Sequence, residues 1–345
     1  MTLIIFILVL GAIIFVHELG HFLFAKIMGV YVYEFSLGMG PRLLHKKGKE
    51  TDYCLRLIPI GGFCSMAGEE IDEEDIKVPK KRRLQAKKPW QRFLIMFFGP
   101  GFNFIFAILL LFFVAIICGS PSYKPIISET TKNYPAYEAG LRKGDKILTI
   151  NNHKISTLDD VSLYLTLANP KNKTTIEVVT KSGENKEYKV KPKKETKKGT
   201  TTYKYGIGLK STKKYGFVNS VKYTVVKTGS LFKQMWITVE SLFTGGVKVN
   251  QLSGPVGIYS IVGEQSKAGL SSILYLMAFL SINVGFINLI PFPAFDGGHI
   301  LFIVIEKIKG SPVSSKTENM IHTIGLFLLM ALMIYITFND ILKLF

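Results

Sequence analysis

Two histidines and a glutamate near the start of the chain have the residue types and spacing of a zinc hydrolase site. His17, Glu18 and His21 form an H-E-x-x-H motif, which on a helix places both imidazoles on one face. The glutamate between them can take a proton from a water that the ion activates. Apolar sequence surrounds the motif, LIIFILVLGAIIFV before it and FLFA after it. This placement predicts peptide hydrolysis within a membrane.

A catalytic zinc ion needs one more protein ligand and an open position for water. The metzincin spacing would require Gly at 24 and His at 27, where this chain has Phe24 and Ile27. A thermolysin-like arrangement would use a downstream glutamate, for which Glu34 in YVYEFSLG is the only nearby candidate. Asp296, far along the chain, is the favoured candidate.

Asp296 follows Pro291 and Pro293, which break an apolar segment. Irregular backbone at membrane depth is tolerated where it is buried in protein or lines a wet cavity. An acidic side chain there is costly unless something pairs with it, so we expect Asp296 to be the third zinc ligand. His299 is a candidate for supporting it. In the alternative interpretation, Asp296 only caps a helix that starts near Gly297.

Four stretches are apolar and long enough to span a bilayer, which takes about 20 residues. They cover roughly residues 3–28, 93–118, 273–295 and 321–338. The first runs on through the His/Glu motif and has no basic start, so we do not expect it to be removed as a signal peptide.

The chain carries a net charge of +18, with a dense basic block over residues 42–92. Loops rich in Lys and Arg beside membrane helices stay in the cytoplasm, and this block also suits anionic lipid head groups. The N-terminus, residues 119 to about 270 and the C-terminus are then extracytoplasmic, and a loop with Lys307, Lys309 and Lys316 is cytoplasmic. His17 and Asp296 both fall in the cytoplasmic half of the membrane.

Composition also argues against other classes. The sequence contains no nucleic-acid-binding motif, so we do not expect a nucleic-acid partner despite the positive charge. Three cysteines without a C-x-x-C pair predict neither a disulfide framework nor a cysteine zinc site.

The extracytoplasmic part begins with a predicted α/β domain over residues 119–212. KILTIN (146–151) alternates like a strand, 159–168 predicts a short helix and 174–180 alternates again. The core AGLRKGDKILTIN (139–151) resembles a PDZ domain, a module that binds extended peptides at a sheet edge. In the alternative interpretation it is a packing module without a peptide ligand.

Residues 213–270 predict an amphipathic linker region. Within 217–247, apolar residues recur at helical spacing in LFKQMWITVESLF. This segment lies either on the outer membrane surface or against the helical bundle. The next segment, LSGPVGI (252–258), predicts a loop.

Nearly the whole chain resembles the site-2 protease family of intramembrane zinc metalloproteases, in its bacterial RseP/RasP-like group. The resemblance rests on HELGH, NLIPFPAFDGG (288–298) and the PDZ-like insertion, with further matches in FSLGMGPRL (35–43), PIGGFCSMAGE (59–69), GPGFNFIFAI (99–108) and LSGPVGI. Two departures are a Phe295 in place of the usual Leu, and a single PDZ core where some relatives have two.

The resemblance implies roles for individual residues. His17, His21 and Asp296 would bind one zinc ion per chain, and Glu18 would be the catalytic residue. Asn288 would hold the substrate backbone within the segment broken by Pro291 and Pro293. The stretch Gly61, Gly62 and Phe63 would belong to a membrane-associated β-element on the cytoplasmic side that presents the substrate as an extended strand.

The predicted fold is a polytopic α-helical membrane protein with an inserted extracytoplasmic α/β domain. Its parts are an N-terminal membrane core (1–118), the PDZ domain (119–212), the linker (213–270) and a C-terminal membrane core (271–345). The predicted partners are the lipid bilayer, single-pass membrane proteins as substrates, and a peptide at the PDZ groove. In relatives the substrates are anti-sigma factors and remnant signal peptides, already shortened by another protease. The alternatives are a membrane-anchored PDZ scaffold with a non-catalytic metal site, and a metal transporter with several sites along a path.

Overall fold

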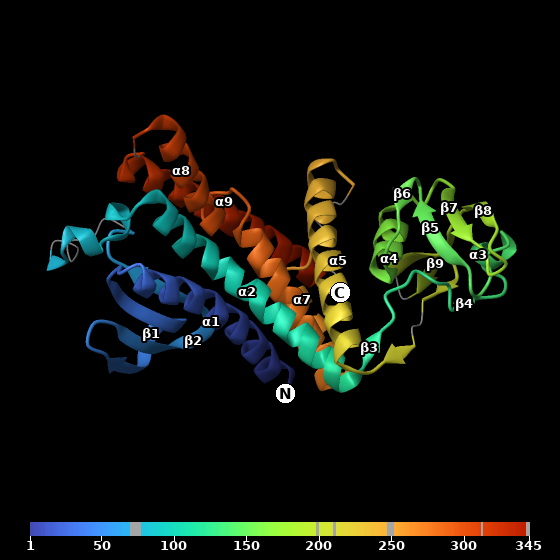
Figure 1. Cartoon of the computed structure of the whole chain (residues 1–345), viewed down its shortest axis with the longest axis horizontal. Coiled ribbons are helices and arrows are strands. Elements are labelled where there is room, and N and C mark those ends of the chain that lie inside the picture. Colours follow the sequence, from blue (N-terminus) through green and yellow to red (C-terminus); the bar gives the residue numbers. More distant parts are fainter. Residues whose placement is uncertain (70–76, 198–199, 210–211, 247–251, 312, 343–345) are drawn as a thin grey trace. The chain divides into compact units, whose positions relative to one another are not determined.

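The chain divides into two compact units, one inserted into the other. The structure is a computed structural model that describes residues 1–69, 77–197, 200–209, 212–246, 252–311 and 313–342. The first unit comprises Met1–Leu111 and Val249–Phe345, and the second comprises Phe112–Lys248 (Figure 1). Helix α2 (Pro89–Cys118) contributes to both.

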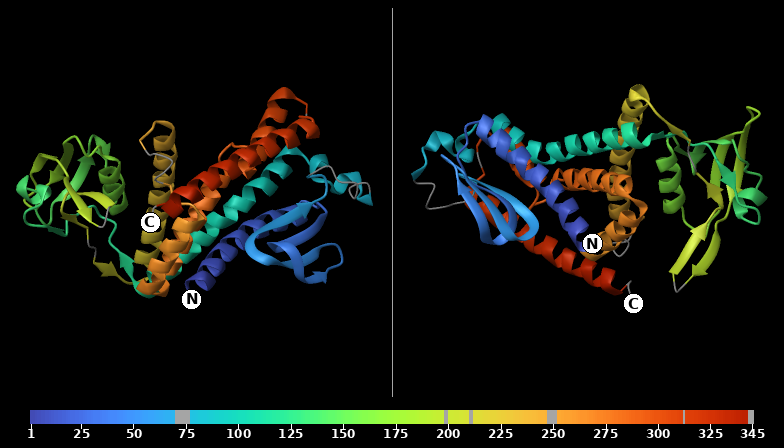
Figure 2. Two further views of the ribbon diagram at one scale, coloured as in Figure 1. Left: turned by 180° about the vertical axis from the view of Figure 1, so that it is seen from behind. Right: turned by 90° about the horizontal axis from the view of Figure 1, so that it is seen from below.

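Long apolar helices form the first unit. Besides α2 they are α1 (Thr2–Ile27), α6 (Pro255–Ala268), α7 (Leu270–Asn288), α8 (Asp296–Lys309) and α9 (Ser315–Leu342) (Figure 2). Among the described residues, α1, α2, α7 and the Lys316–Leu342 part of α9 are long and apolar enough to cross a membrane. The predicted number of helices long and apolar enough to span a membrane, about four, is confirmed.

The third apolar stretch is broken where the prolines predict. Helix α7 ends at Asn288, and residues 289–295 form turns and bends before α8 begins at Asp296. Pro291 and Pro293 lack the N–H groups that would continue a helix. The break therefore releases Asp296 from the line of α7.

The prediction that Lys307 and Lys309 lie in a loop is wrong, because both residues belong to the last turn of α8. An ion pair and a buried side chain help to hold this helix. Its residue Glu306 forms an ion pair with Arg92 of α2, and Ile303 is buried. The helix ends at Gly310, whose left-handed conformation (φ +76°) suits glycine.

The predicted loop LSGPVGI is also partly wrong, because α6 begins inside it at Pro255. The N–H groups of Gly254 and Gly257 both donate to the carboxylate of Asp340, at 2.7 and 2.9 Å. A carboxylate at a helix N-terminus satisfies free N–H groups and interacts favourably with the helix dipole. Because Asp340 lies at the far end of α9, local sequence does not reveal this cap.

Strands β1 (Val32–Lys47) and β2 (Asp52–Met66) form an antiparallel sheet that packs along α1 (Figure 1). Phe35 opposes Cys64 on one side and Tyr53 on the other, and Tyr53 also opposes Lys46. The segments therefore lie in the order 62–66, 32–37, 52–56 and 42–47. Within the described sheet, 62–66 is an edge. Two helical turns, Lys80–Arg82 and Leu84–Ala86, precede α2.

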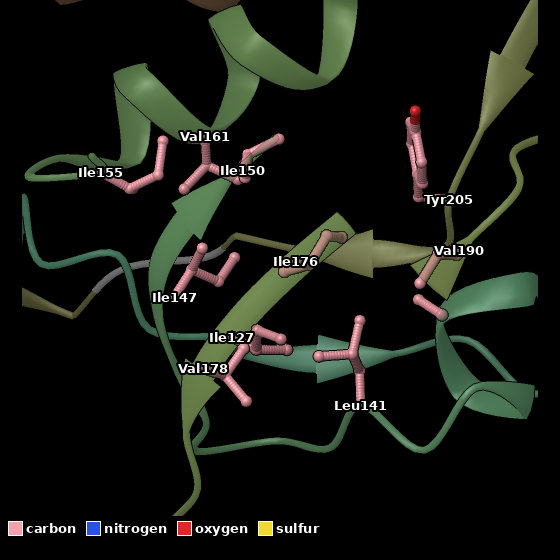
Figure 3. Close-up of a cluster of buried hydrophobic side chains, with 11 residues drawn as sticks. Ile127, Leu141, Ile147, Ile150, Ile155, Val161, Ile176, Val178, Val190 and Tyr205 are labelled. Carbon is pink, nitrogen blue, oxygen red and sulfur yellow. The ribbon is translucent and has the colours of Figure 1, made fainter. Parts of the chain in front are cut away.

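The second unit contains a four-stranded antiparallel sheet of order β6–β5–β7–β8. The strands are β5 (Lys146–Ile150), β6 (His153–Lys154), β7 (Thr174–Val179) and β8 (Asn185–Val190). Helices α3 (Pro135–Glu138) and α4 (Leu158–Leu167) complete it. Ile147, Ile150, Ile176 and Val161 lie in its buried core (Figure 3). The predicted strands and short helix are thus confirmed.

Short strand pairs and one long helix flank this sheet. The pairs are β3 (Ser120–Pro121) with β12 (Lys213–Lys214), β4 (Glu129–Thr130) with β11 (Ile207–Gly208), and β9 (Lys193–Lys197) with β10 (Thr200–Lys204). The helix is α5 (Phe217–Phe243), as the apolar spacing predicts. Its Lys227 donates to the carboxylate of Asp159 in α4 at 2.7 Å, so α5 packs on the α/β core.

Candidate metal and active site

Three side chains from distant parts of the first unit meet in a triangle. Nε2 of His17 and Nε2 of His21 lie 3.2 Å apart. Asp296 Oδ2 lies 3.2 Å from the His17 nitrogen, and Oδ1 lies 3.3 Å from the His21 nitrogen. Three ligands about 2.0 Å from one tetrahedral zinc ion would be about 3.3 Å apart. The triangle therefore has the size that a zinc ion requires.

The surroundings of the triangle also fit a cation. Nδ1 of His21 donates to the carbonyl of Ile95 at 2.9 Å, which leaves Nε2 free of its proton for a metal. Asp296 Oδ2 is buried and has no hydrogen-bond donor among the residues that the structure describes. The first turn of α8 favours an ionised carboxylate. The Asp296 side chain points to the histidines, so helix capping is not its main contact.

Asn103 of α2 supports the other histidine. Its amide nitrogen lies 3.3 Å from Nδ1 of His17, and Ser281 of α7 donates to its backbone carbonyl at 2.8 Å. Ligation through Nε2 leaves the proton on Nδ1 of His17. The amide must then present its oxygen to His17, which a 180° rotation achieves.

We expect Asn103→Leu to lower zinc affinity about 10- to 100-fold, because the imidazole of His17 loses its orienting acceptor. Asn103→Asp, which keeps an oxygen at this position, should retain most of the affinity. Competition with a zinc chelator measures the zinc affinity of both variants. Equal losses in the two variants would argue against the oxygen as the orienting atom.

Two glycines allow α1 and α2 to approach closely at the triangle. A Cβ on Gly20 would lie 2.0 Å from the carbonyl oxygen of Phe98. A Cβ on Gly99 would lie 2.1 Å from Nε2 of His21. Small residues at such crossings bring membrane helices into backbone contact. The space for the metal ligands therefore depends on the absence of side chains here.

Glu18 lies between α1 and the edge of the β1–β2 sheet. The backbone N–H of Cys64 faces its carboxylate. A Cβ on Gly62 would lie 3.3 Å from Cγ of Glu18 and 2.9 Å from the carbonyl oxygen of Ser36. A cavity of about 460 Å³ joins Glu18 to all three residues of the triangle and to Phe63. The general base, metal ligands and sheet edge thus share one space.

The other residues predicted to bind the substrate do not all lie at the larger cavity. Asn288 lines a separate cavity of about 270 Å³ that also borders His17, Glu18 and Asp296. Gly61 lies next to Gly62 with φ +99°, and a Cβ there would lie 2.7 Å from the side chain of Met39. Pro291 and Pro293 lie in the connection between α7 and α8 and line neither of these two cavities.

Glu34, the alternative third ligand, is bound elsewhere. Its carboxylate accepts hydrogen bonds from Arg56 at 2.7 and 2.9 Å and from Arg42 at 2.5 Å. Burial alone would raise the pKa of Glu34, but these hydrogen bonds outweigh it and hold the pKa below its usual range. Glu34 is therefore part of the ion pairing of the sheet.

We expect Glu34→Gln to destabilise the protein by about 1–3 kcal/mol at pH 7, because two arginines lose their charged acceptor. A lowered pKa means that this stabilisation is present above about pH 4.3 and is lost as the pH falls further. Thermal unfolding in detergent should show a smaller difference in stability between wild type and Glu34→Gln at pH 3 than at pH 7. An unchanged difference would contradict the ion-pair explanation.

Sequence reasoning assigned no role to Asn103 or Glu69. Asn103 is the only amide in the apolar stretch 93–118. A single polar side chain in such a stretch needs a hydrogen-bond partner, and this could have pointed to a role for Asn103. Glu69 lines the larger cavity and accepts a hydrogen bond from the N–H of Met66. Burial raises the pKa of Glu69 to about 7.

Helices able to cross a membrane, an H-E-x-x-H helix and a zinc-sized triangle together define a membrane-embedded zinc metalloprotease. A family model described as "Peptidase family M50" matches residues 5–332. The chain therefore belongs to peptidase family M50, the site-2 type of zinc metalloprotease. Membership favours an enzyme over the scaffold and transporter alternatives.

The similarity to three relatives extends over almost the whole length of both chains. "Putative zinc metalloprotease CPE1693" of Clostridium perfringens is 37% identical, over 99% of both chains. "Putative zinc metalloprotease SACOL1281" of Staphylococcus aureus is 33% identical, over all of this chain and 99% of the relative. "Regulator of sigma-W protease RasP" of Bacillus subtilis is 31% identical, with the same coverage.

Proposed function

We propose that this zinc metalloprotease cleaves single-pass membrane proteins within or near the membrane. His17, His21 and Asp296 hold the zinc ion, and Glu18 is the general base. The observation that carries the proposal is the shared cavity, in which Glu18, the ligand triangle and a strand edge meet within a unit whose helices are long and apolar enough to cross a membrane.

The proposed mechanism divides the work among these residues. When bound, zinc polarises the scissile carbonyl and lowers the pKa of water. Glu18 removes a proton from the attacking water and passes it to the leaving nitrogen. The N–H of Cys64 orients the Glu18 carboxylate for this step. Asn103 and the carbonyl of Ile95 fix the two imidazoles.

The edge segment 62–66 offers a docking place for an unwound substrate. Residues 64 and 66 of a strand point their N–H groups to the same side. The N–H of Met66 donates to Glu69, hence away from β1, and the N–H of Cys64 faces Glu18. A substrate strand added at this edge would pass directly beside Glu18. Asn288 would hold the substrate backbone from the other cavity.

In the proposed topology the basic segment 42–92 is cytoplasmic. The N-terminus, the second unit and the C-terminus are extracytoplasmic, which the positive-inside rule supports. The α/β part of the second unit would act as a PDZ-like filter that admits substrates with a shortened outer domain. Its AGLRKGD turn, with Gly140 and Gly144 at φ +105° and +99°, supports this assignment.

The name of the Bacillus subtilis relative associates it with sigma-W. By analogy, anti-sigma factors and remnant signal peptides are the proposed substrates. The test co-expresses a tagged, outer-truncated single-pass anti-sigma factor with wild type, Glu18→Gln and Asp296→Asn. We expect cleavage by wild type alone. Cleavage by Glu18→Gln, or none by wild type, would overturn the proposal.

A further inference from the structure

A third histidine, His299, lines the proposed catalytic cavity, and its contacts allow a role beyond the support of Asp296. His299 lies three residues after Asp296 on α8, so the two side chains share a helix face. It lines the same cavity of about 460 Å³ as Glu18 and the two histidines of the triangle. Its ring is thus within the space where a substrate carbonyl would react.

The contacts of His299 fix which nitrogen faces that space. Nδ1 lies 3.2 Å from the Glu318 carboxylate of α9. A carboxylate accepts, so Nδ1 carries a hydrogen. The His322 ring stacks on the His299 ring, with centroids 3.9 Å apart and planes 17° apart. With Nδ1 engaged and one face covered, Nε2 remains as the polar atom available to the cavity.

His299, Glu318 and His322 also place potential metal-ligand atoms within 4.8 Å of one another. However, Nδ1 of His322 accepts the N–H of Ala294 at 3.1 Å. A neutral imidazole that accepts at Nδ1 carries its proton at Nε2 and has no lone pair there for a metal. We therefore treat Glu318 as a hydrogen-bond acceptor that orients His299, and His322 as a ring packed against it.

We propose that His299 donates a hydrogen bond from Nε2–H to the oxygen of the scissile carbonyl, where negative charge develops during attack. This role rests on the proposed function and adds a second stabiliser of that oxygen. Burial opposes a charged ring, but the Glu318 carboxylate that accepts from Nδ1–H raises the pKa of His299 and so favours hydrogen on both nitrogens.

The proposed hydrogen bond leaves the proton balance of hydrolysis unchanged. Water supplies the new C–O bond, and the carbonyl π pair moves to the oxygen. As the C–N bond breaks, the nitrogen takes the proton that Glu18 carries. His299 keeps its hydrogen throughout, so no further reactant is needed.

Two substitutions separate the nitrogens of His299. In His299→Asn the amide nitrogen replaces Nδ1 and can still donate to Glu318, but nothing replaces Nε2. In His299→Gln the amide nitrogen reaches the Nε2 position. With purified full-length protein in detergent and a single-pass anti-sigma factor, we expect His299→Asn to lower kcat about 10²-fold or more. His299→Gln should stay within about 10-fold of wild type. Both variants should keep one zinc per chain and a nearly unchanged KM.

Glu318→Gln leaves His299 intact, keeps an acceptor for Nδ1–H and removes the charge, so we expect an intermediate loss of kcat. The matched control is His45→Asn, because His45 is exposed and lies outside the cavity. Wild-type kcat in His299→Asn, or a greater loss in His299→Gln, would overturn the role of Nε2. Two zinc ions per wild-type chain would overturn it in favour of a second metal site. Absence of cleavage by wild type would instead overturn the proposed function.

Discussion

Glu18→Gln is expected to lower the cleavage rate about 10²- to 10⁴-fold while leaving one zinc ion bound per chain. The amide cannot remove a proton from water. It keeps the size of the carboxyl group and an oxygen that can accept the N–H of Cys64. Zinc remains because its proposed ligands are His17, His21 and Asp296. Cleavage assays and metal analysis on the same preparation measure the two effects.

The control for this substitution is Glu187→Gln, which removes the same charge from an exposed strand, β8, of the second unit. It should cleave at the wild-type rate. Loss of zinc in Glu18→Gln would contradict its assignment as a base that does not bind the metal.

Gly99→Ala is expected to remove both bound zinc and cleavage. The added Cβ would lie 2.1 Å from Nε2 and 2.4 Å from Cε1 of His21, so the ring must leave the triangle. Loss of one of three ligands should lower zinc affinity at least as much as loss of an orienting partner, about 100-fold or more. Metal titration and cleavage assays on the folded variant measure the result.

The same helix offers a matched control. A Cβ on Gly101 would meet only the rings of Phe98 and Phe97, at 3.4 Å and beyond. Gly101→Ala therefore adds an ordinary contact and a better helix former. It should keep its zinc and its activity. If both alanine variants bind zinc normally, the close approach of α1 and α2 does not shape the site.

Local patterns were sufficient to predict the elements that carry the candidate site. The H-E-x-x-H spacing requires only that α1 be helical, and its apolar flanks ensure that. The end of α7 follows from Pro291 and Pro293, which cannot continue a helix. The position of Asp296 after that break could then be inferred, because an isolated carboxylate in an apolar segment requires a partner.

The features that the sequence did not reveal depend on contacts between distant segments. The start of α6 depends on Asp340 of α9, and α8 is held by the pairing of Glu306 with Arg92. From the sequence alone, Glu34 was a candidate zinc ligand. In the folded sheet, its carboxylate pairs instead with Arg42 and Arg56. These partners lie beyond the range of helical or strand periodicity, so periodicity could not identify them.

The most direct test of the proposed site is the zinc content of purified wild type and Asp296→Ala after dialysis against a weak chelator. Asp296 is the one ligand of the triangle that lies outside the H-E-x-x-H motif, about 280 residues further along the chain. We expect one zinc per wild-type chain and little or none in the variant, with the helices still folded. Equal zinc in both proteins would contradict the split site of His17, His21 and Asp296.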